Sequence, residues 1–315
     1  MRRLALLLVV GAGVGSAGCK PDLGSPPSLI DAPRFLAVVS NPPEAGPGET
    51  VSLHALIVKP DGQYAEDAPA SWAICTTPRP VSQNNAVADD CVFTAQEAIP
   101  TRALAVEAVL PLDTCARFGP DPPTSAPGQP PLRPVDPDPT GGYFQPVRSL
   151  LQDTPGHYVA AFGLPRITCN LADAPVDIAV EFRTRYKANK NPVINGVAVS
   201  MDGATSVDAR GAQIKAGALV TFVTRWPGGT AETYPVFDRS VRALVDHRES
   251  LRVSWFATAG EFDHDRTGAA EDDPALSTAN DWLAPSEPGP VHLWVVLRDS
   301  RGGTDVASVD VDVVP

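Results

Sequence analysis

The sequence predicts an all-β protein built from two tandem β-sandwiches, and three observations support this. The chain of 315 residues contains 34 Pro and 25 Gly, and its apolar stretches are short and rich in Val. Such a composition favours strands separated by turns over long helices. A strand pattern that leads to a Trp recurs in both halves, and the C-terminal end is typical of a long β-hairpin. The length leaves room for two domains of ordinary size.

The N-terminal nineteen residues are typical of an export signal. Arg2 and Arg3 form a short positive region, residues 4–10 are apolar, and a run of small residues ends at Cys19. The apolar run is far shorter than the ~20 residues that a transmembrane helix needs. These residues therefore predict a cleaved secretory signal over residues 1–18.

The run Ser16-Ala17-Gly18-Cys19 resembles the lipobox of bacterial lipoproteins, although Leu is commoner than Ser at the first position. The resemblance implies cleavage before Cys19, lipid on its thiol, and attachment to a membrane through that lipid. Lys20 stands where an Asp would suggest retention in the inner membrane, so the outer membrane is favoured, with the protein facing the periplasm or the cell surface. The alternative is an ordinary cleaved signal with a free Cys19.

Residues 19–33 are expected to be a lipidated tether. Four prolines lie among small polar residues after Cys19, and no apolar periodicity is present. Such a segment is extended, at ~3 Å per residue, and does not fold alone.

The first sandwich is expected over residues 34–187. Residues 41–49 hold three prolines and two glycines and predict a turn in which no strand ladder continues. Trp72 is expected to fill the space between the two sheets. The predicted strands cover residues 35–40, 50–59, 70–75, 156–168 and 176–185.

A Pro-rich loop is expected to interrupt this sandwich over residues 111–146, which contain eleven prolines. That density excludes a helix or a central strand. Two interpretations remain open: a passive insertion, or an extended segment that an aromatic groove of a partner recognises.

The second sandwich is expected over residues 188–315. Its strands are predicted at residues 195–201, 218–226 and 251–257, and an insertion at 227–250 separates the last two. Trp255 then occupies the same place in the order as Trp72, which predicts an internal repeat. Two alternating strands around Asp299-Ser300-Arg301-Gly302-Gly303 predict the final hairpin.

Several motifs of this half carry a family resemblance: Val253-Ser254-Trp255-Phe256, Gly260-Glu261-Phe262, Trp282-Leu283-Ala284-Pro285 and the final hairpin. They resemble the Ig-like and PKD-like sandwiches of bacterial surface proteins. The first half resembles a more elaborate relative, and the whole chain is similar to outer-surface lipoproteins abundant in myxobacteria. By analogy only, the resemblance implies a binding or structural module.

Four cysteines remain if Cys19 carries lipid, and an even number in an exported chain predicts two disulfides. Three pairings can be drawn. Cys75 with Cys91 and Cys115 with Cys169 is favoured, because each bond then closes its own loop. A zinc site is the weaker alternative, since Cys-x2-Cys spacing and nearby His are missing.

The charge of the chain restricts its partners. The net charge is −12, and removal of Arg2 and Arg3 with the signal makes it −14. An anionic surface repels nucleic acid and anionic lipid, so no nucleic-acid partner is expected. Divalent cations, basic proteins and neutral glycans remain.

One acidic turn is a candidate calcium site. Asp263, Asp265 and Thr267 alternate before a Gly, as oxygen ligands do in calcium loops. Pro274 stands where an EF-hand has its bidentate Glu, which excludes an EF-hand. A solvated acidic turn is the other interpretation, and a glycosidase carboxylate pair is the least supported. The candidate ligands are Asp263, Asp265, Thr267, Asp272 and Asp273.

No nucleophile elbow, dinucleotide or phosphate loop, or His-Glu-x-x-His motif occurs in the sequence. We therefore expect a non-catalytic, lipid-anchored cell-envelope protein with a binding or structural role, no cofactor other than calcium, and an unidentified protein or glycan ligand. A calcium-dependent adhesin or glycan-binding module is the first alternative, and an envelope hydrolase is the second.

Overall fold

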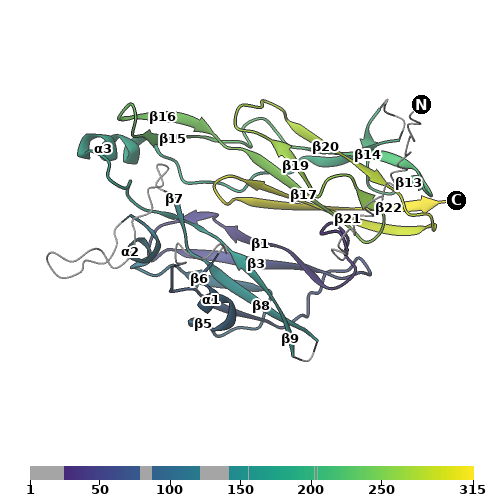
Figure 1. Cartoon of the computed structure of the whole chain (residues 1–315), viewed down its shortest axis with the longest axis horizontal. Helices are drawn as coiled ribbons and strands as arrows, with labels where there is room; N and C mark the ends of the chain where they lie inside the picture. Colours follow the sequence, from purple (N-terminus) through teal and green to yellow (C-terminus); the bar gives the residue numbers. More distant parts are fainter. Residues whose placement is uncertain (1–24, 79–86, 121–141, 155, 202, 204) are drawn as a thin grey trace, which may run out of the picture.

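The computed structural model describes residues 25–78, 87–120, 142–154, 156–201, 203 and 205–315. These residues form 22 strands and three short helices, and the strands build two sandwiches (Figure 1). The predicted fold class is thus confirmed. No helix in the described ranges is long and apolar enough to cross a membrane. The predicted signal peptide and Cys19 lie outside these ranges.

The first sandwich contains two main sheets and a short third one. Val51 and Leu53 of one sheet pack against Trp72 of the other, and the Trp72 indole N–H donates to the carbonyl of Ala103 at 2.8 Å. One main sheet has the order β1 (Arg34–Asn41), β3 (Thr50–Val58), β6 (Ala105–Val109). The other main sheet has the order β5 (Glu97–Ile99), β4 (Ala70–Ile74), β8 (Val147–Thr154), β9 (His157–Gly163). The short sheet has the order β2 (Glu44–Ala45), β10 (Arg166–Thr168), β7 (Gly142–Phe144).

The second sandwich contains two five-stranded sheets, with one hairpin inserted beside them. Its core includes Trp255 and Trp282, which are both fully buried. The first sheet has the order β12 (Val207–Asp208), β11 (Gly196–Ser200), β14 (Leu219–Arg225), β20 (Ser277–Leu283), β18 (Glu261–Phe262). The second sheet has the order β13 (Ala212–Lys215), β22 (Thr304–Val314), β21 (Gly289–Asp299), β17 (Leu251–Ala257), β19 (Arg266–Ala269). The hairpin consists of β15 (Thr233–Asp238) and β16 (Ala243–Arg248).

The two sandwiches repeat one pairing order. The set β1-β3-β6 corresponds to β11-β14-β20, and the set β5-β4-β8-β9 corresponds to β19-β17-β21-β22. A parallel pairing closes each unit, between β2 and β10 and between β13 and β22. Trp72 on β4 and Trp255 on β17 therefore occupy equivalent places, and the β15–β16 hairpin is the insertion expected between the second and third strands.

The segment expected to be a fifth strand is a helix, so that prediction is wrong. Helix α3 (Val176–Arg185) follows Pro175, whose fixed φ suits the start of a helix. The alternation that suggested a strand also places Ile178, Phe182 and Tyr186 four residues apart, which is one face of a helix. That face packs on Leu171, whereas Val176 is 81% exposed.

Two loop predictions also need correction. The expected turn at residues 41–49 contains β2, whose Glu44 and Ala45 pair in parallel with Arg166 and Ile167. The ends of the Pro-rich segment 111–146 are ordered as the helix α2 (Thr114–Phe118) and the edge strand β7. Residues 121–141 lie outside the described ranges. A further short helix, α1 (Asp89–Phe93), precedes β5.

The tether predicted over residues 19–33 is shorter than expected, because its last part belongs to the fold. The Ile30 amide donates to the carbonyl of Ala257, and the Ala257 amide donates to the carbonyl of Ser28, each at 2.9 Å. Leu29 thereby pairs in parallel with the end of β17. The chain thus crosses the second sandwich before it enters β1 of the first.

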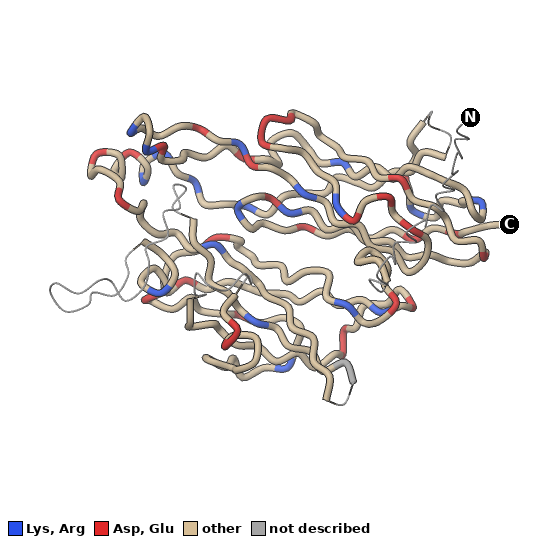
Figure 2. Tube along the Cα trace, in the orientation of Figure 1, with Lys and Arg blue, Asp and Glu red and all other residues tan. Residues whose placement is uncertain are grey.

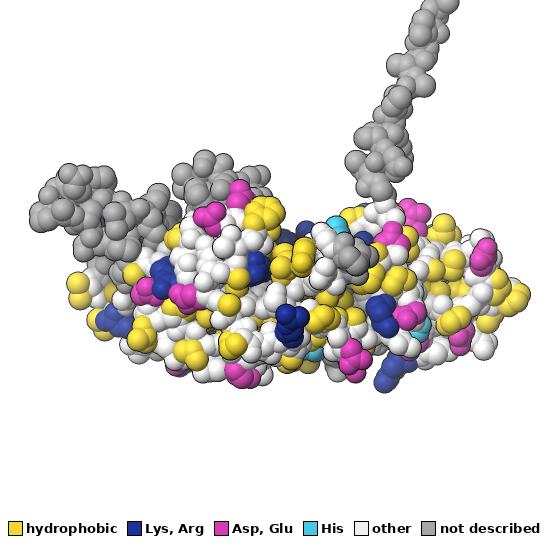
Figure 3. Space-filling view, turned by 90° about the horizontal axis from the view of Figure 1, so that it is seen from below, with side chains coloured by type: hydrophobic (Ala, Val, Ile, Leu, Met, Phe, Trp, Pro, Cys, Tyr) yellow, Lys and Arg dark blue, Asp and Glu magenta, His cyan; other side chains and the backbone are white. Residues whose placement is uncertain are grey.

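An apolar interface joins the sandwiches face to face. The outer face of β1 and β3 covers the outer face of β21, so the apolar residues on these outer faces are buried. Apolar and charged side chains are interspersed on the described part of the surface seen in Figure 3. The buried members of the apolar interface are Ile30, Leu36, Ala37, Val58, Trp294 and Val296.

Candidate functional site

A buried ionic cluster lies beside this apolar interface, and we call it the ionic joint. Its centre is Arg301 in the turn between β21 and β22, with a side chain that is 1% exposed. The turn is held by Asp299, whose carboxylate accepts the amide N–H groups of Arg301 at 2.9 Å and Gly303 at 2.8 Å. A Cβ on Gly303 would lie 2.1 Å from that carboxylate, so the turn requires glycine here.

The Arg301 guanidinium binds groups from three segments of the chain. It donates from Nε to Glu249 at 2.6 Å and from Nη2 to Glu232 at 2.8 Å, both of which flank the β15–β16 hairpin. From Nη1 it donates to the Tyr186 hydroxyl at 3.2 Å and to the Lys187 carbonyl at 3.0 Å in the segment between the sandwiches. Its donors are thus divided between the inserted hairpin and the connecting segment.

Glu44 anchors the first sandwich to the same cluster. Its carboxylate accepts hydrogen bonds from the Tyr186 hydroxyl at 2.8 Å, the Asn189 amide at 2.8 Å and the Thr168 hydroxyl at 3.0 Å. Arg166 lies 3.5 Å away and is itself 3% exposed. The ionic joint therefore connects β2 and β10 of the first sandwich with the final hairpin of the second.

The ionic joint holds more acidic than basic side chains, and burial raises the pKa of three of its members. Its acids are Glu44, Glu232, Glu249 and Asp299, against Arg166 and Arg301. Burial, and then the nearby Asp299, raise the pKa of Glu249 to about 7, although Arg301 opposes the change. Burial also raises the pKa of Asp299 and brings the pKa of Tyr186 to about 12.

Helix α3 extends the contact between the halves. Phe182 packs with Leu171 and with Phe237 of β15. At the end of the helix, Arg185 pairs with Asp246 of β16 at 2.7 Å. The insertion at residues 227–250 therefore packs against α3, the helix that precedes the connecting segment.

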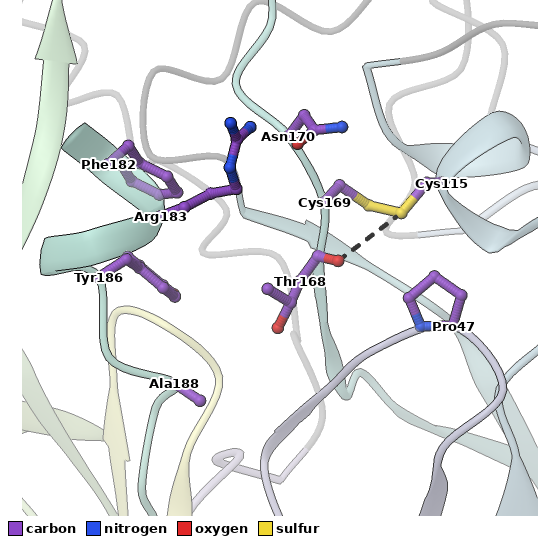
Figure 4. Close-up of a pocket in the computed structure, with 9 residues that line it drawn as sticks. All are labelled: Pro47, Cys115, Thr168, Cys169, Asn170, Phe182, Arg183, Tyr186 and Ala188. Atoms are coloured by element: carbon purple, nitrogen blue, oxygen red, sulfur yellow. Dashed lines mark hydrogen bonds between the residues drawn. A yellow bond between two sulfur atoms is a disulfide. The ribbon is translucent and has the colours of Figure 1, made fainter. Parts of the chain in front are cut away.

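A pocket of about 540 Å³ opens next to the ionic joint (Figure 4). Phe182 and Tyr186 of α3 form one wall, with ring centroids 4.8 Å apart. The Cys115–Cys169 disulfide and Pro47 form the facing wall. Tyr186 belongs to both features, because its ring lines the pocket while its hydroxyl bonds with Glu44 in the ionic joint.

Polar groups at this pocket come from three positions. Thr168 ends β10, Asn170 follows the disulfide, and Arg183 lies on α3, and all three residues are exposed. Apolar walls with a few polar groups are what a small-molecule or sugar site usually provides, and the volume lies within the range of such sites.

The four cysteines predicted to form disulfides do so in the favoured pairing. Cys75 at the end of β4 bonds to Cys91 in α1, and Cys115 in α2 bonds to Cys169 after β10. The second bond closes a segment with a sequence separation of 54 and forms part of the pocket wall.

The structure does not gather the candidate calcium ligands. Asp263 and Asp265 precede β19, whereas Asp272 and Asp273 follow it, so a whole strand separates the two pairs. The Thr267 hydroxyl accepts the indole N–H of Trp255 at 2.9 Å. Within the described ranges, no group of three or more His, Cys, Asp or Glu side chains is arranged to hold a metal ion.

The residues of the ionic joint were not singled out from the sequence. Glu44 and Arg301 lie in segments interpreted as turns, and Glu249 ends the predicted insertion. One signal is present in the sequence Asp299-Ser300-Arg301. A hairpin turn requires glycine but no charged residues, so an acid and a base in this turn indicate a role beyond forming the turn. Acids and bases are otherwise spread over both sandwiches (Figure 2).

Comparisons with known proteins add little to this description. No protein-family model and no curated protein sequence matches the chain. Among solved structures, it is similar to latent PorU of Porphyromonas gingivalis (8% identity, TM-score 0.22, 90% of this chain and 24% of that chain). It is also similar to the C-terminal domain of the antigen I/II-family protein AspA of Streptococcus pyogenes (11%, 0.24, 90% and 99%) and to the adhesin InvE of Yersinia pseudotuberculosis (9%, 0.22, 87% and 58%). The chain thus spans about a quarter of the PorU chain.

Proposed function

We propose that this chain is an exported, lipid-anchored protein of the bacterial cell envelope that presents a binding surface on a rigid body of two sandwiches and catalyses no reaction. The observation that carries the proposal is the combination of the ionic joint with the apolar interface. Together they bury charged and apolar groups from both halves, which is a costly arrangement for domains that move independently.

The docked N-terminal segment supports the anchoring role. If lipid is attached to Cys19, the residues up to Ser28, at ~3.3 Å each, span about 30 Å at most. Because Ser28 and Ile30 are bonded to β17, the body is held close to the membrane by its second sandwich. A protein anchored in this way would keep α3 and the pocket within a limited distance of the bilayer.

The pocket favours a short glycan as the ligand. Sugar rings offer apolar C–H faces, which fit the half-buried Tyr186 ring, and hydroxyl groups, which fit Asn170 and Arg183. The calcium-dependent form of this role has less support, since the acidic side chains at 263–273 lie at both ends of β19.

The anchor is tested by Cys19→Ser in the native host, with fractionation of membranes and mass spectrometry of the mature N-terminus. The proposal expects an acylated Cys19 in wild type and loss of the protein from the membrane fraction in the variant. An unchanged distribution would refute the lipid anchor.

The ligand is tested by glycan-array binding of the detergent-solubilised protein. Asn170→Ala combined with Arg183→Ala should abolish binding to the recognised glycan, whereas Arg225→Ala, at an exposed position at the end of β14 in the other sandwich, should not. Equal binding by all three proteins would place the ligand elsewhere. Turnover in an ester, glycoside and peptide screen would contradict the non-catalytic role.

A further inference from the structure

Three arginines share one outer face of the second sandwich. Arg252 on β17 stands directly opposite Arg298 on β21 in the strand register. Arg266 on β19 stands opposite Ser254, two residues along β17, and side chains two residues apart on a strand lie on the same face. Arg252, Arg266 and Arg298, which we call the arginine triad, therefore project together.

This arrangement is electrostatically unfavourable as it stands. Like charges that stand directly opposite each other on neighbouring strands destabilise a sheet. The chain contains 37 acidic residues, so a lack of acids in the sequence does not explain why these three arginines lack a carboxylate partner. Among the described residues seven other arginines form ion pairs, whereas none of the arginine triad does. Nearby Asp299 is committed to the turn amides and to Asn189.

Arg298 is held in place without being neutralised. Its Nη2 donates to the carbonyl of Leu36 in β1 at 2.8 Å, so the first sandwich orients the guanidinium. Burial, then Arg266 and Arg252, lower the pKa of Arg298 to about 10. An anion bound here would supply the missing negative charge and accept the remaining N–H donors, which a guanidinium presents in a planar fork.

We propose that the arginine triad is a binding site for a phosphate group, beside the line where the two sandwiches meet. Three guanidinium groups on one face match the several oxygen atoms of a phosphate better than the two of a carboxylate. The hydroxyl of Ser254 lies in the same row and can donate a further hydrogen bond. The site is separate from the α3 pocket and does not depend on the lipid anchor.

Two sources of phosphate fit this chemistry: a lipid headgroup and a soluble phosphate ester. The docked segment at Ser28 lies on the other end of β17, roughly 17 Å from Arg252 at ~3.3 Å per residue. A membrane that holds the N-terminus would therefore be within reach of the arginine triad.

The test uses the full chain with Cys19→Ser, so that no lipid mediates membrane binding. Binding of inorganic phosphate is measured by calorimetry, and binding to vesicles is measured by sedimentation with phosphatidylcholine alone or mixed with phosphatidylglycerol. Arg252→Gln combined with Arg266→Gln should weaken phosphate binding tenfold or more. Arg225→Gln combined with Arg242→Gln removes the same charge from exposed positions elsewhere and should change it little.

Each outcome decides the proposal. Phosphate binding that only the Arg252 and Arg266 variant loses supports the site, and matching retention on phosphatidylglycerol vesicles identifies a lipid source. Phosphate binding without vesicle binding identifies a soluble source. The proposal is overturned if the protein with an intact arginine triad binds neither inorganic phosphate nor phosphatidylglycerol vesicles. It is also overturned if the Arg252 and Arg266 variant binds phosphate as well as the Arg225 and Arg242 variant does. Melting temperatures establish that the variants fold, and relief of like-charge repulsion should keep that of the Arg252 and Arg266 variant at or above the wild-type value.

Discussion

Replacing Arg301 with Met tests whether the ionic joint holds the sandwiches together. The change removes a guanidinium that donates to Glu249, Glu232, Tyr186 and the Lys187 carbonyl. Met keeps much of the side-chain length, so the main effect is to leave buried carboxylates without a counter-charge. Removing one partner from a buried ion pair costs about 3–5 kcal/mol. That is a large fraction of the total stability of a domain, about 5–15 kcal/mol.

The assay is equilibrium denaturation at neutral pH followed by Trp fluorescence. Wild type should unfold in one transition because the halves are coupled, whereas Arg301→Met should lose stability and separate into two transitions. The loss should shrink as the pH falls below about 7, since the pKa of Glu249 is about 7 and its protonation removes an unpaired charge. The matched control is Arg210→Met, because Arg210 pairs with Asp208 but is 76% exposed. A cost no greater than that of the control would refute the role assigned to the ionic joint.

Three further predictions address single features. Because the pKa of Glu249 is raised from 4.5 to about 7, its contribution to the stability of wild type should be fully present below pH 4.5 and about 3 kcal/mol smaller by pH 7; Glu249→Gln should flatten this decline in urea melts, and an unchanged slope would contradict the assignment. Gly62 has φ +83°, and a Cβ there would lie 1.9 Å from the His292 ring across the interface, so Gly62→Ala should cost about 1–3 kcal/mol in thermal melts, whereas Gly228→Ala in open space should not. Replacing Cys115 and Cys169 with Ser opens a segment of 54 residues and should cost about 4 kcal/mol in denaturation curves; a loss below about 1 kcal/mol would argue against that pairing in solution.

Strands with one buried face could be predicted closely from the sequence. The predicted strand at residues 251–257 has the same bounds as β17, because Val253 and Trp255 alternate with polar residues and Gly260 ends the pattern. The disulfide pairs could also be predicted from the sequence, since pairing each cysteine with its neighbour along the chain requires no knowledge of the fold.

Features that depend on contact between the halves could not be predicted in this way. Trp294 and Val296 alternate with the core residues of β21 and are buried against the first sandwich, a contact that the predicted hairpin alone does not specify. Glu44 and Arg301 are far apart in the sequence, and no local pattern indicates that they meet. Residues 176–185 were predicted to be a strand, whereas Ile178, Phe182 and Tyr186 lie on one face of a helix and pack against Leu171.

The central claim is that two sandwiches form one rigid body, and a distance measured between them tests it most directly. Spin labels on Ala105→Cys in β6 and Ala279→Cys in β20 occupy equivalent, exposed positions of the two units. In the Cys19→Ser background, pulsed electron paramagnetic resonance should give one narrow distance distribution, which Arg301→Met broadens and Arg210→Met leaves unchanged. A broad distribution in the protein with an intact ionic joint would contradict the claim.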